Sequence, residues 1–325
     1  MKAIEITKFG GPDVLSMVNR SIPEIRRGEV LIKVAAAGVN RPDIFQRQGF
    51  YKPPIGVSNI LGLEISGEIV SGDAHLGGFS IGDKVCALVS GGGYAQYCIA
   101  NVKHCLPIPL NVSLEDSAGL PEALFTSWSN LVDKGKIKKG ESLLVHGGSS
   151  GVGVMAIQLA KSLGCNVYAT AGSDRKVNFV ESIGAIKCIN YRSEDFVSEI
   201  NRITKCNGVN VILDMVSGDY FDRNLSILSR GGRLLIIALL GGAFSSINSG
   251  YILKKGLIVI GSMLRPQSVA FKHMIARSLR QVVWPLFSRG EIRPMTYSYI
   301  PFENVIDSHK LMESGEHVGK IILVM

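Results

Sequence analysis

The pattern of hydrophobic and polar positions changes once along the chain. Up to about residue 123, short β-like runs are broken by glycine, proline and Gly-Asp turns. From Leu124 onward, near-continuous apolar runs alternate with helical segments, which is typical of strands buried on both faces of a parallel sheet. After Pro266 the pattern becomes helical, and it ends in a strand-like segment at 320–324. We therefore predict a β-rich domain over 1–123 and 266–325, which the last strand rejoins, and an α/β domain over 124–265.

The individual runs predict the elements of each domain. In the β-rich domain we expect strands at 1–6, 30–36, 68–70, 83–88 and 94–99. In the α/β domain we expect six strands, at 143–146, 166–170, 187–189, 209–215, 233–239 and 257–261, and helices at 152–163, 175–183, 195–204 and 220–228. Gly164 and Gly184 follow the first two helices, where a left-handed cap would lie. This pattern predicts a doubly wound Rossmann fold, with a ligand beyond the carboxyl ends of its six parallel strands.

Composition and charge limit the class of protein. A chain of 325 residues, 46% hydrophobic and 19% charged, is long enough for about two globular domains. Its net charge of +8 is spread in ones and twos. This favours a solvated basic face or attraction of an anionic cofactor, and makes nucleic-acid binding possible but unsupported. The six cysteines lack zinc-site spacing, and neither the N-terminus nor the apolar run at 234–240 resembles a signal or membrane segment. We therefore expect a cytoplasmic protein that does not bind membranes.

A glycine-rich turn follows the first strand of the α/β domain and opens a helix. In a dinucleotide-binding turn, the first small residue permits the bend, the second lets the backbone approach the pyrophosphate, and the third packs the helix against the strand. Gly148, Ser150 and Gly153 take these places, so a serine replaces the middle glycine, although Gly151 keeps the loop open. The N-H groups at the helix start suit phosphate. The predicted cofactor contacts of the turn are Gly148, Ser149, Ser150, Gly151, Val152 and Gly153.

The same turn permits a second chemistry. Residues 147–151 also form a G-x-S-x-G nucleophile elbow, in which Ser149 would be acylated. Such a hydrolase needs a downstream histidine, for which only His309 or His317 can be nominated.

The next strand tip indicates which dinucleotide is bound. Where an NAD site has an acid for the ribose 2′-hydroxyl, this chain has Ala171, followed by Gly172. The Ser173 hydroxyl and the Lys176 ammonium group can instead bind a 2′-phosphate, which favours NADPH over NADH. Tyr191, near the tip of the third strand, could flank that phosphate or pack at an interface. Ser173 could equally cap a helix with Lys176 in solvent, and Asp174 lies past the expected place of an NAD acid.

These segments together resemble one family over essentially the whole chain. The sequence is similar to the quinone-oxidoreductase, or zeta-crystallin-like, branch of the medium-chain dehydrogenase/reductase superfamily, and within it to the tumour-suppressor-inducible quinone reductases. The segments that carry the resemblance are 37–43, 49–51, 61–67, 82–85, 93–95, 146–153, 158–161, 170–173 and 319–321. Zinc alcohol dehydrogenases of the superfamily have a ligand cysteine where Asn40 stands and a histidine where Leu63 stands. The resemblance therefore implies an enzyme without zinc.

The resemblance also implies a fold and a site. It implies a GroES-like β domain and a Rossmann domain with the active-site cleft between them, and a homodimer joined near 257–261. Asn40, Asp43 and Tyr51 match catalytic positions at the nicotinamide end, although Asn40 and Asp43 could simply form a turn and cap, and Tyr51 a packed loop aromatic. The positions that match cofactor contacts are Thr126, Leu239, Gly241, Met263, Leu264 and Arg265.

The absence of zinc ligands favours a particular reaction. Without a Lewis acid, reduction of an activated acceptor is easier than oxidation of an alcohol. We expect NADPH-dependent reduction of quinones by proximity and orientation, with Tyr51 orienting the acceptor oxygen while Asn40 and Asp43 fix the surrounding wall. An enone or enoyl reductase shares every motif. More remote alternatives are RNA binding and the serine hydrolase.

Overall fold

The structure is a computed structural model that describes all 325 residues. The chain forms two compact units, Met1–Phe125 with Arg265–Met325, and Thr126–Leu264. The expected boundaries, after residue 123 and before residue 266, lie within two residues of these. No helix is both long enough and apolar enough to cross a membrane.

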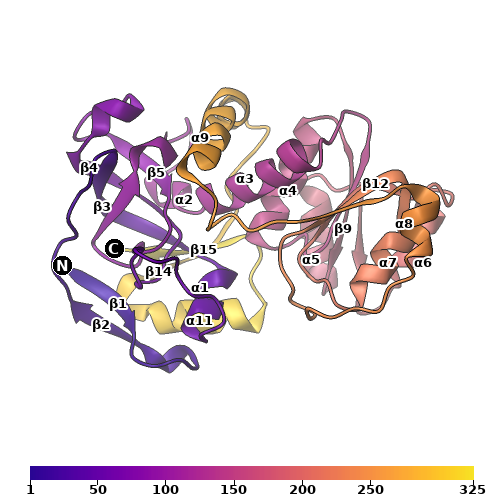
Figure 1. Cartoon of the computed structure of the whole chain (residues 1–325), viewed down its shortest axis with the longest axis horizontal. Coiled ribbons are helices and arrows are strands. Elements are labelled where there is room, and N and C mark those ends of the chain that lie inside the picture. The colour runs from indigo at the N-terminus through magenta and orange to yellow at the C-terminus, as the bar shows by residue number, and fades with distance from the viewer. The chain divides into compact units, whose positions relative to one another are not determined.

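The first unit is built on a mostly antiparallel sheet of seven strands (Figure 1). Their order is β14-β15-β3-β4-β5-β7, and β6 pairs with β3. The strands are β3 (Glu29–Val39), β4 (Glu64–Gly72), β5 (Lys84–Leu88), β6 (Tyr97–Asn101), β7 (Cys105–Pro107), β14 (Thr296–Pro301) and β15 (Lys320–Val324), with β1 (Lys2–Ile6) and β2 (Leu15–Asn19) forming a separate pair. Strand β15 pairs antiparallel with β3, so the last strand joins the first unit as predicted. Strands β2, β7 and β14 were not predicted.

Short helices cover this sheet. They are α1 (Arg41–Arg47), α2 (Leu114–Ser117), α9 (Val269–Ser278), α10 (Trp284–Ser288) and α11 (Val305–Ser314), while α3 (Pro121–Trp128) crosses the boundary into the second unit. Buried side chains from β1, β3, β4, β5 and β15 form one hydrophobic core with residues of α1 and α11. This core holds the ends of β3 and β4, from which the polar side chains described below extend.

The second unit is the predicted doubly wound domain. Its six strands are all parallel and lie in the order β10-β9-β8-β11-β12-β13. In chain order this is 3-2-1-4-5-6, the order of a dinucleotide-binding sheet. The strands are β8 (Ser142–Val145), β9 (Asn166–Ala171), β10 (Lys187–Asn190), β11 (Val209–Asp214), β12 (Leu228–Ile236) and β13 (Ile258–Gly261). The six-stranded Rossmann sheet is thus confirmed.

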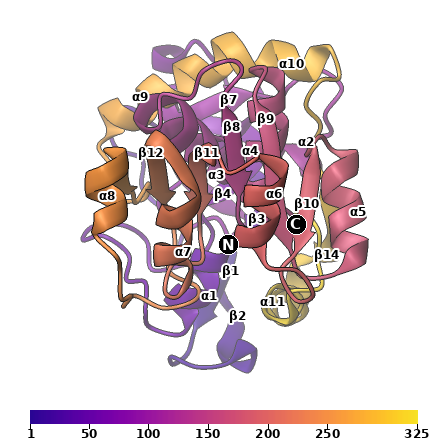
Figure 2. The same ribbon diagram turned by 90° about the vertical axis from the view of Figure 1, so that its right-hand side faces the viewer.

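Helices cover both faces of this sheet (Figures 1 and 2). Helices α4 (Gly151–Ser162) and α5 (Asp174–Ser182) pack on one face, and α6 (Phe196–Ile203), α7 (Tyr220–Ile227) and α8 (Gly250–Lys255) on the other. Each face has its own core, which explains why the inner strands β8, β9 and β11 are mostly apolar. Gly164 has the expected left-handed φ of 79°, whereas Gly184 has a φ of 129°.

In the second unit, only β12 departs from its predicted range by more than two residues. In the first unit, β3 ends three residues later, β4 begins four residues earlier and β6 begins three residues later than predicted. Strand β12 begins at Leu228 and ends at Ile236, whereas the sequence predicts 233–239. The chain leaves the sheet after Ile236, and Leu239 and Leu240 are about half exposed. The apolar sequence continues past Ile236, where the strand ends, and the predicted strand was therefore too long at its C-terminal end.

Candidate functional site

The glycine-rich turn connects β8 to α4, as the sequence predicts. Its bend lies at Gly147, which has a φ of 65° that favours glycine. A Cβ atom on Gly148 would lie 2.8 Å from the Cβ of Ala169, and one on Gly153 would lie 2.4 Å from the carbonyl oxygen of Gly147. Gly148 and Gly153 are therefore needed for close packing, and the bend itself falls one residue earlier than the sequence predicts.

Ser150 explains the departure from three glycines. It is the N-cap of α4, and its Oγ accepts a hydrogen bond from the backbone N-H of Gly153 at 3.0 Å. The N-H groups of Gly151 and Val152, in the first turn of the helix, have no partner within the helix. An anion at this end of α4 can accept hydrogen bonds from them.

The hydrolase alternative for Ser149 finds no support. Positive φ within the turn occurs at Gly147 and not at the serine, although a nucleophile elbow strains the serine itself. The proposed bases His309 and His317 both belong to the first unit, and the fully buried His309 contacts Arg47 at 3.2 Å.

A buried histidine beneath the turn joins three strand ends. Asn224 donates through Nδ2 to Asp214 at 3.0 Å, so its Oδ1 accepts from His146 Nε2 at 2.7 Å. His146 Nδ1 is then the acceptor for the Thr170 hydroxyl at 3.1 Å. Complete burial lowers the pKa of His146, which keeps the ring neutral and this tautomer in place. Asp214, His146 and Thr170 lie at the carboxyl ends of β11, β8 and β9, which are thus held together.

The tip of β9 brings two of the predicted residues together. Ala171 is buried, and a Cβ atom on Gly172 would lie 2.5 Å from the Tyr191 hydroxyl oxygen. Tyr191 therefore covers Gly172, and the two predicted residues are brought together. Ser173 is the N-cap of α5, but its hydroxyl makes no capping hydrogen bond. Lys176 lies in the first turn of the same helix.

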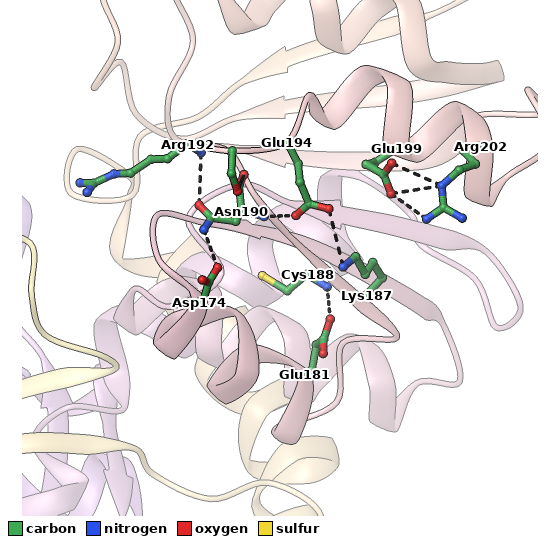
Figure 3. Close-up of polar contacts among 10 residues, drawn as sticks. Asp174, Glu181, Lys187, Cys188, Asn190, Arg192, Glu194, Glu199 and Arg202 are labelled. Atoms are coloured by element: carbon green, nitrogen blue, oxygen red, sulfur yellow. Dashed lines mark hydrogen bonds and ion pairs between the residues drawn. The ribbon is translucent and has the colours of Figure 1, made fainter.

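Asn190 organises the polar groups beside this tip (Figure 3). Its Nδ2 donates to Asp174 at 2.7 Å, its Oδ1 accepts from the backbone N-H of Arg192 at 3.2 Å, and its own N-H donates to Glu194 at 2.9 Å. Glu194 also pairs with Lys187 at 3.8 Å. The exposed guanidinium group of Arg192 extends away from these residues (Figure 3).

In the first unit, Asp43 is completely paired. Its carboxylate accepts hydrogen bonds from the backbone N-H of Asn40 at 2.8 Å, from the N-H of Gly62 at 3.0 Å and from the Tyr94 hydroxyl at 3.3 Å. Burial raises the pKa of Asp43 to about 6, although the two backbone hydrogen bonds oppose the rise. These contacts support the alternative in which Asn40 and Asp43 form a turn and helix cap.

The Asn40 side chain contacts a buried ion pair. Lys320 and Glu64 lie 2.5 Å apart, and both are almost fully buried. Asn40 Nδ2 donates to Glu64 at 2.8 Å, and Lys320 donates to Asn40 Oδ1 at 2.7 Å. The other Glu64 oxygen accepts from the backbone N-H of Glu122 at 2.8 Å. A Cβ atom on Gly38 would lie 2.2 Å from Glu64 Oε1, so only glycine leaves room for this pair.

Tyr51 packs against Arg265. The guanidinium carbon lies 5.2 Å from the centre of the Tyr51 ring, within the range of a cation-π contact. Arg265 also donates to the carbonyl oxygen of Ser90 at 2.8 Å and to the side chain of Gln46 at 2.9 Å, while its buried Nη2 has no partner. Burial and the nearby Glu122 raise the pKa of Tyr51 to about 12, so the phenol stays protonated.

The remaining predicted residues lie at several places in the second unit. Thr126 is buried in α3, and its carbonyl oxygen accepts from Asn130 at 2.8 Å. Leu239 is half exposed, and the N-H of Gly241 donates to the carbonyl oxygen of Val216 at 2.7 Å. Met263 and Leu264 follow β13 at the end of the unit.

No group of three or more histidine, cysteine or acidic side chains is arranged to hold a metal ion.

The fold, the polar region at the glycine turn and the tip of β9, and the polar region around Asn40 together define a class of protein. A Rossmann sheet with a glycine turn at its switch point, joined to a GroES-like β unit, is the architecture of a two-domain dehydrogenase/reductase.

Comparison with known proteins narrows this class. Residues 26–110 match the alcohol dehydrogenase GroES-like domain, and residues 151–280 match the zinc-binding dehydrogenase family. The quinone oxidoreductase of Sus scrofa is 30% identical, over 100% of this chain and 98% of that protein. The structure of Escherichia coli quinone oxidoreductase complexed with NADPH matches with a TM-score of 0.86 at 27% identity, over 100% of both chains. The chain belongs to the quinone oxidoreductase family of the medium-chain dehydrogenases/reductases, and it is an oxidoreductase.

An enoyl reductase is also similar. The CurK enoyl reductase has a TM-score of 0.86 at 26% identity, over 100% of this chain and 99% of that one.

Proposed function

We propose that this protein is a zinc-independent NADPH:quinone reductase. The observation that carries the proposal is the tip of β9, where the Ser173 hydroxyl makes no capping bond and the first acid after the tip, Asp174, is held by Asn190. A site without a free carboxylate, with Lys176 in the same helical turn, favours a 2′-phosphate. The similar Escherichia coli enzyme was solved with NADPH, which supports the same cofactor here.

The residues present fit the rest of the dinucleotide. The backbone N-H groups of Gly151 and Val152, at the start of α4, can bind the pyrophosphate, and Gly148 lets the backbone approach it. Tyr191 beside Gly172 supplies a flat surface for the adenosine end. Bound NADPH supplies the hydride of the reaction. The chain itself provides binding, orientation and exclusion of water.

The arrangement around Asn40 supports a reaction without zinc. The resemblance to zinc enzymes places metal ligands at Asn40 and Leu63, but Leu63 has no donor atom. The Asn40 oxygen already accepts from the Lys320 ammonium group, which balances the buried charge of Glu64. This donor set fits an ammonium group better than Zn²⁺, which takes nitrogen, sulfur or carboxylate ligands. Without a Lewis acid to polarise it, the hydride acceptor must itself be reactive, as a quinone is.

The acceptor side includes Tyr51, whose protonated hydroxyl has no partner within the chain and can donate to an acceptor oxygen. Asn40 and Asp43 fix the wall of this region through the contacts described above. The second candidate is an enone or enoyl reductase, which the similarity to the CurK enoyl reductase favours.

The test is the loss of nicotinamide absorbance with NADPH or NADH across a panel of quinones and enones, with and without a zinc chelator. We expect quinone reduction that prefers NADPH and is unchanged by the chelator. Turnover with enones alone would favour the second candidate. Failure to oxidise NADPH with any acceptor would refute both, and labelling of Ser149 by a fluorophosphonate would support a hydrolase instead. Salt-sensitive RNA retention competed by NADPH would point to a binding role.

We also propose that two copies of the chain pair through β13. This strand is at the edge of the six-stranded sheet, and Ile258 and Val259 on it are exposed. An exposed apolar edge strand is a template for pairing with a second strand.

A further inference from the structure

Three carboxyl groups in the first unit differ in how they are paired. Asp43 accepts three hydrogen bonds, and Glu64 is held by Lys320, Asn40 and the Glu122 backbone. No hydrogen bond or ion pair reaches the carboxyl group of Glu122 itself. The first two groups are therefore part of the framework, and Glu122 remains able to exchange a proton with a bound molecule.

Glu122 lies among many charges. It is the second residue of α3, and the charged groups around it are Glu64, Asp43, Lys320, Lys272 and Arg265. Burial, followed by the negative charge of Glu64, raises the pKa of Glu122 to about 8, and the two lysines only partly oppose the rise. The carboxyl group therefore carries its proton at neutral pH.

Two further polar groups near Glu122 are also unpaired. The Tyr51 hydroxyl accepts and donates no hydrogen bond within the chain, and Glu122 is the charge that most raises its pKa. Arg265 stacks on the Tyr51 ring with 7% of its surface exposed, and its Nη2 has no partner. Buried polar groups without partners are rare in native proteins. Arg265 Nη2 is such a group, and the unpaired Tyr51 hydroxyl and Glu122 carboxyl near it are each partly buried. Together the three groups indicate a place for an oxygen-bearing ligand.

We propose that Glu122 is the catalytic proton donor to the acceptor, an assignment that rests on the proposed quinone reductase function. The acceptor is reduced by one hydride, the O-H bond of Glu122 breaks, and the proton forms a new bond to the acceptor oxygen. The carboxylate then regains a proton from water. Tyr51 and Arg265 hold the same oxygen and stabilise its developing negative charge.

The chemistry favours Glu122 over Tyr51 as the donor. A general acid works best when its pKa is near the working pH, which holds for Glu122 at about 8 but not for Tyr51 at about 12. Tyr51 can donate a hydrogen bond without giving up its proton.

The first test compares E122Q, E122D and the exposed control E303Q. General acid catalysis contributes about 10²-fold to 10⁴-fold, so we expect E122Q to lower kcat for quinone reduction by about 10²-fold or more. The wild-type kcat should fall as pH rises through about 8, because the acid form is needed. E122D should keep this alkaline limb and part of the rate, E122Q should lose the limb, and E303Q should match the wild type. If the kcat of E122Q still fell as the pH rises through about 8, as in the wild type, the assignment would be overturned.

The second test needs neither cofactor nor acceptor. A carboxyl group whose pKa rises from 4.5 to about 8 on folding costs no stability below pH 4.5 and progressively more up to pH 8. By urea unfolding, E122Q should therefore gain stability relative to the wild type across this window, whereas E303Q should not. A difference in stability between E122Q and the wild type that does not change with pH would show that Glu122 ionises normally. That result would overturn the role of Glu122 and leave the proposed function untouched. Lack of any NADPH oxidation by the wild type would instead overturn the proposed function.

Discussion

The side-chain amide of Asn190 donates to the carboxylate of Asp174 over 2.7 Å, from the end of β10 to the start of α5 (Figure 3). Asp174 is the acid nearest to the place where an NAD enzyme binds the ribose 2′-hydroxyl. The amide thus restrains the one carboxylate that could repel a 2′-phosphate or accept from a 2′-hydroxyl. We therefore expect cofactor choice to depend on Asn190 as well as on the residues proposed to face the cofactor.

Replacing Asn190 should weaken that choice. In N190L the Asp174 carboxylate loses its donor, and like-charge repulsion of about 1 kcal/mol at a few ångströms corresponds to roughly a fivefold rise in KM for NADPH. The KM for NADH should stay the same or fall. Steady-state kinetics with both cofactors measure this, and the double variant N190L/D174N should restore the KM for NADPH. Equal values for the single and double variants would disprove a role for the freed charge.

Lys176 should contribute affinity for NADPH alone. A charge-assisted hydrogen bond is worth about 1.5–3 kcal/mol, so K176A should raise the KM for NADPH by roughly tenfold or more without changing that for NADH. K33A removes an exposed lysine of the first unit and serves as the control. Equal effects of K176A on both cofactors would refute the 2′-phosphate assignment.

The Lys320–Glu64 pair should be needed for stability. K320M leaves the Glu64 carboxylate buried without its cation, which typically costs about 3–5 kcal/mol. The midpoint of urea unfolding should therefore fall sharply. The double variant K320M/E64Q removes the buried charge, and it keeps an oxygen that can accept from Asn40 and from the Glu122 backbone. It should therefore recover much of the lost stability. A double variant no more stable than K320M would show that packing, and not charge, causes the loss.

The edge strand should govern association. V259K places a charge on β13, and we expect it to convert a dimer into a monomer in sedimentation or light scattering. K254A, on exposed α8, changes charge nearby and should leave the dimer intact. A wild-type protein that is monomeric at high concentration would contradict the pairing itself.

Local patterns made the Rossmann unit predictable. Most of its strands contain a short apolar run, and the glycine turn occupies a few consecutive residues, so neither depends on distant contacts. Even so, the bend falls at Gly147 instead of Gly148, because the choice between adjacent glycines depends on packing against Ala169. Strand β14 was missed because its side chains alternate between half-buried and exposed around Pro301, next to helical segments.

The polar cluster of the first unit was predictable only in part. The resemblance indicated Asn40 and Asp43, but Lys320, which pairs with Asn40, lies 280 residues further along the chain. No local pattern links two such positions. Glu122 was missed for a different reason: an acid in the first turn of a helix is a common stabilising feature, and only the fold shows that this carboxyl group is partly buried among other charges and unpaired.

The buried link from Thr170 through His146 and Asn224 to Asp214 has a consequence for how a ligand is received. All four side chains have their hydrogen-bond partners within the chain. The edge of the sheet where a dinucleotide binds is therefore ordered when the protein folds. Binding need not organise it, and the affinity is not reduced by the entropy of fixing three strand ends.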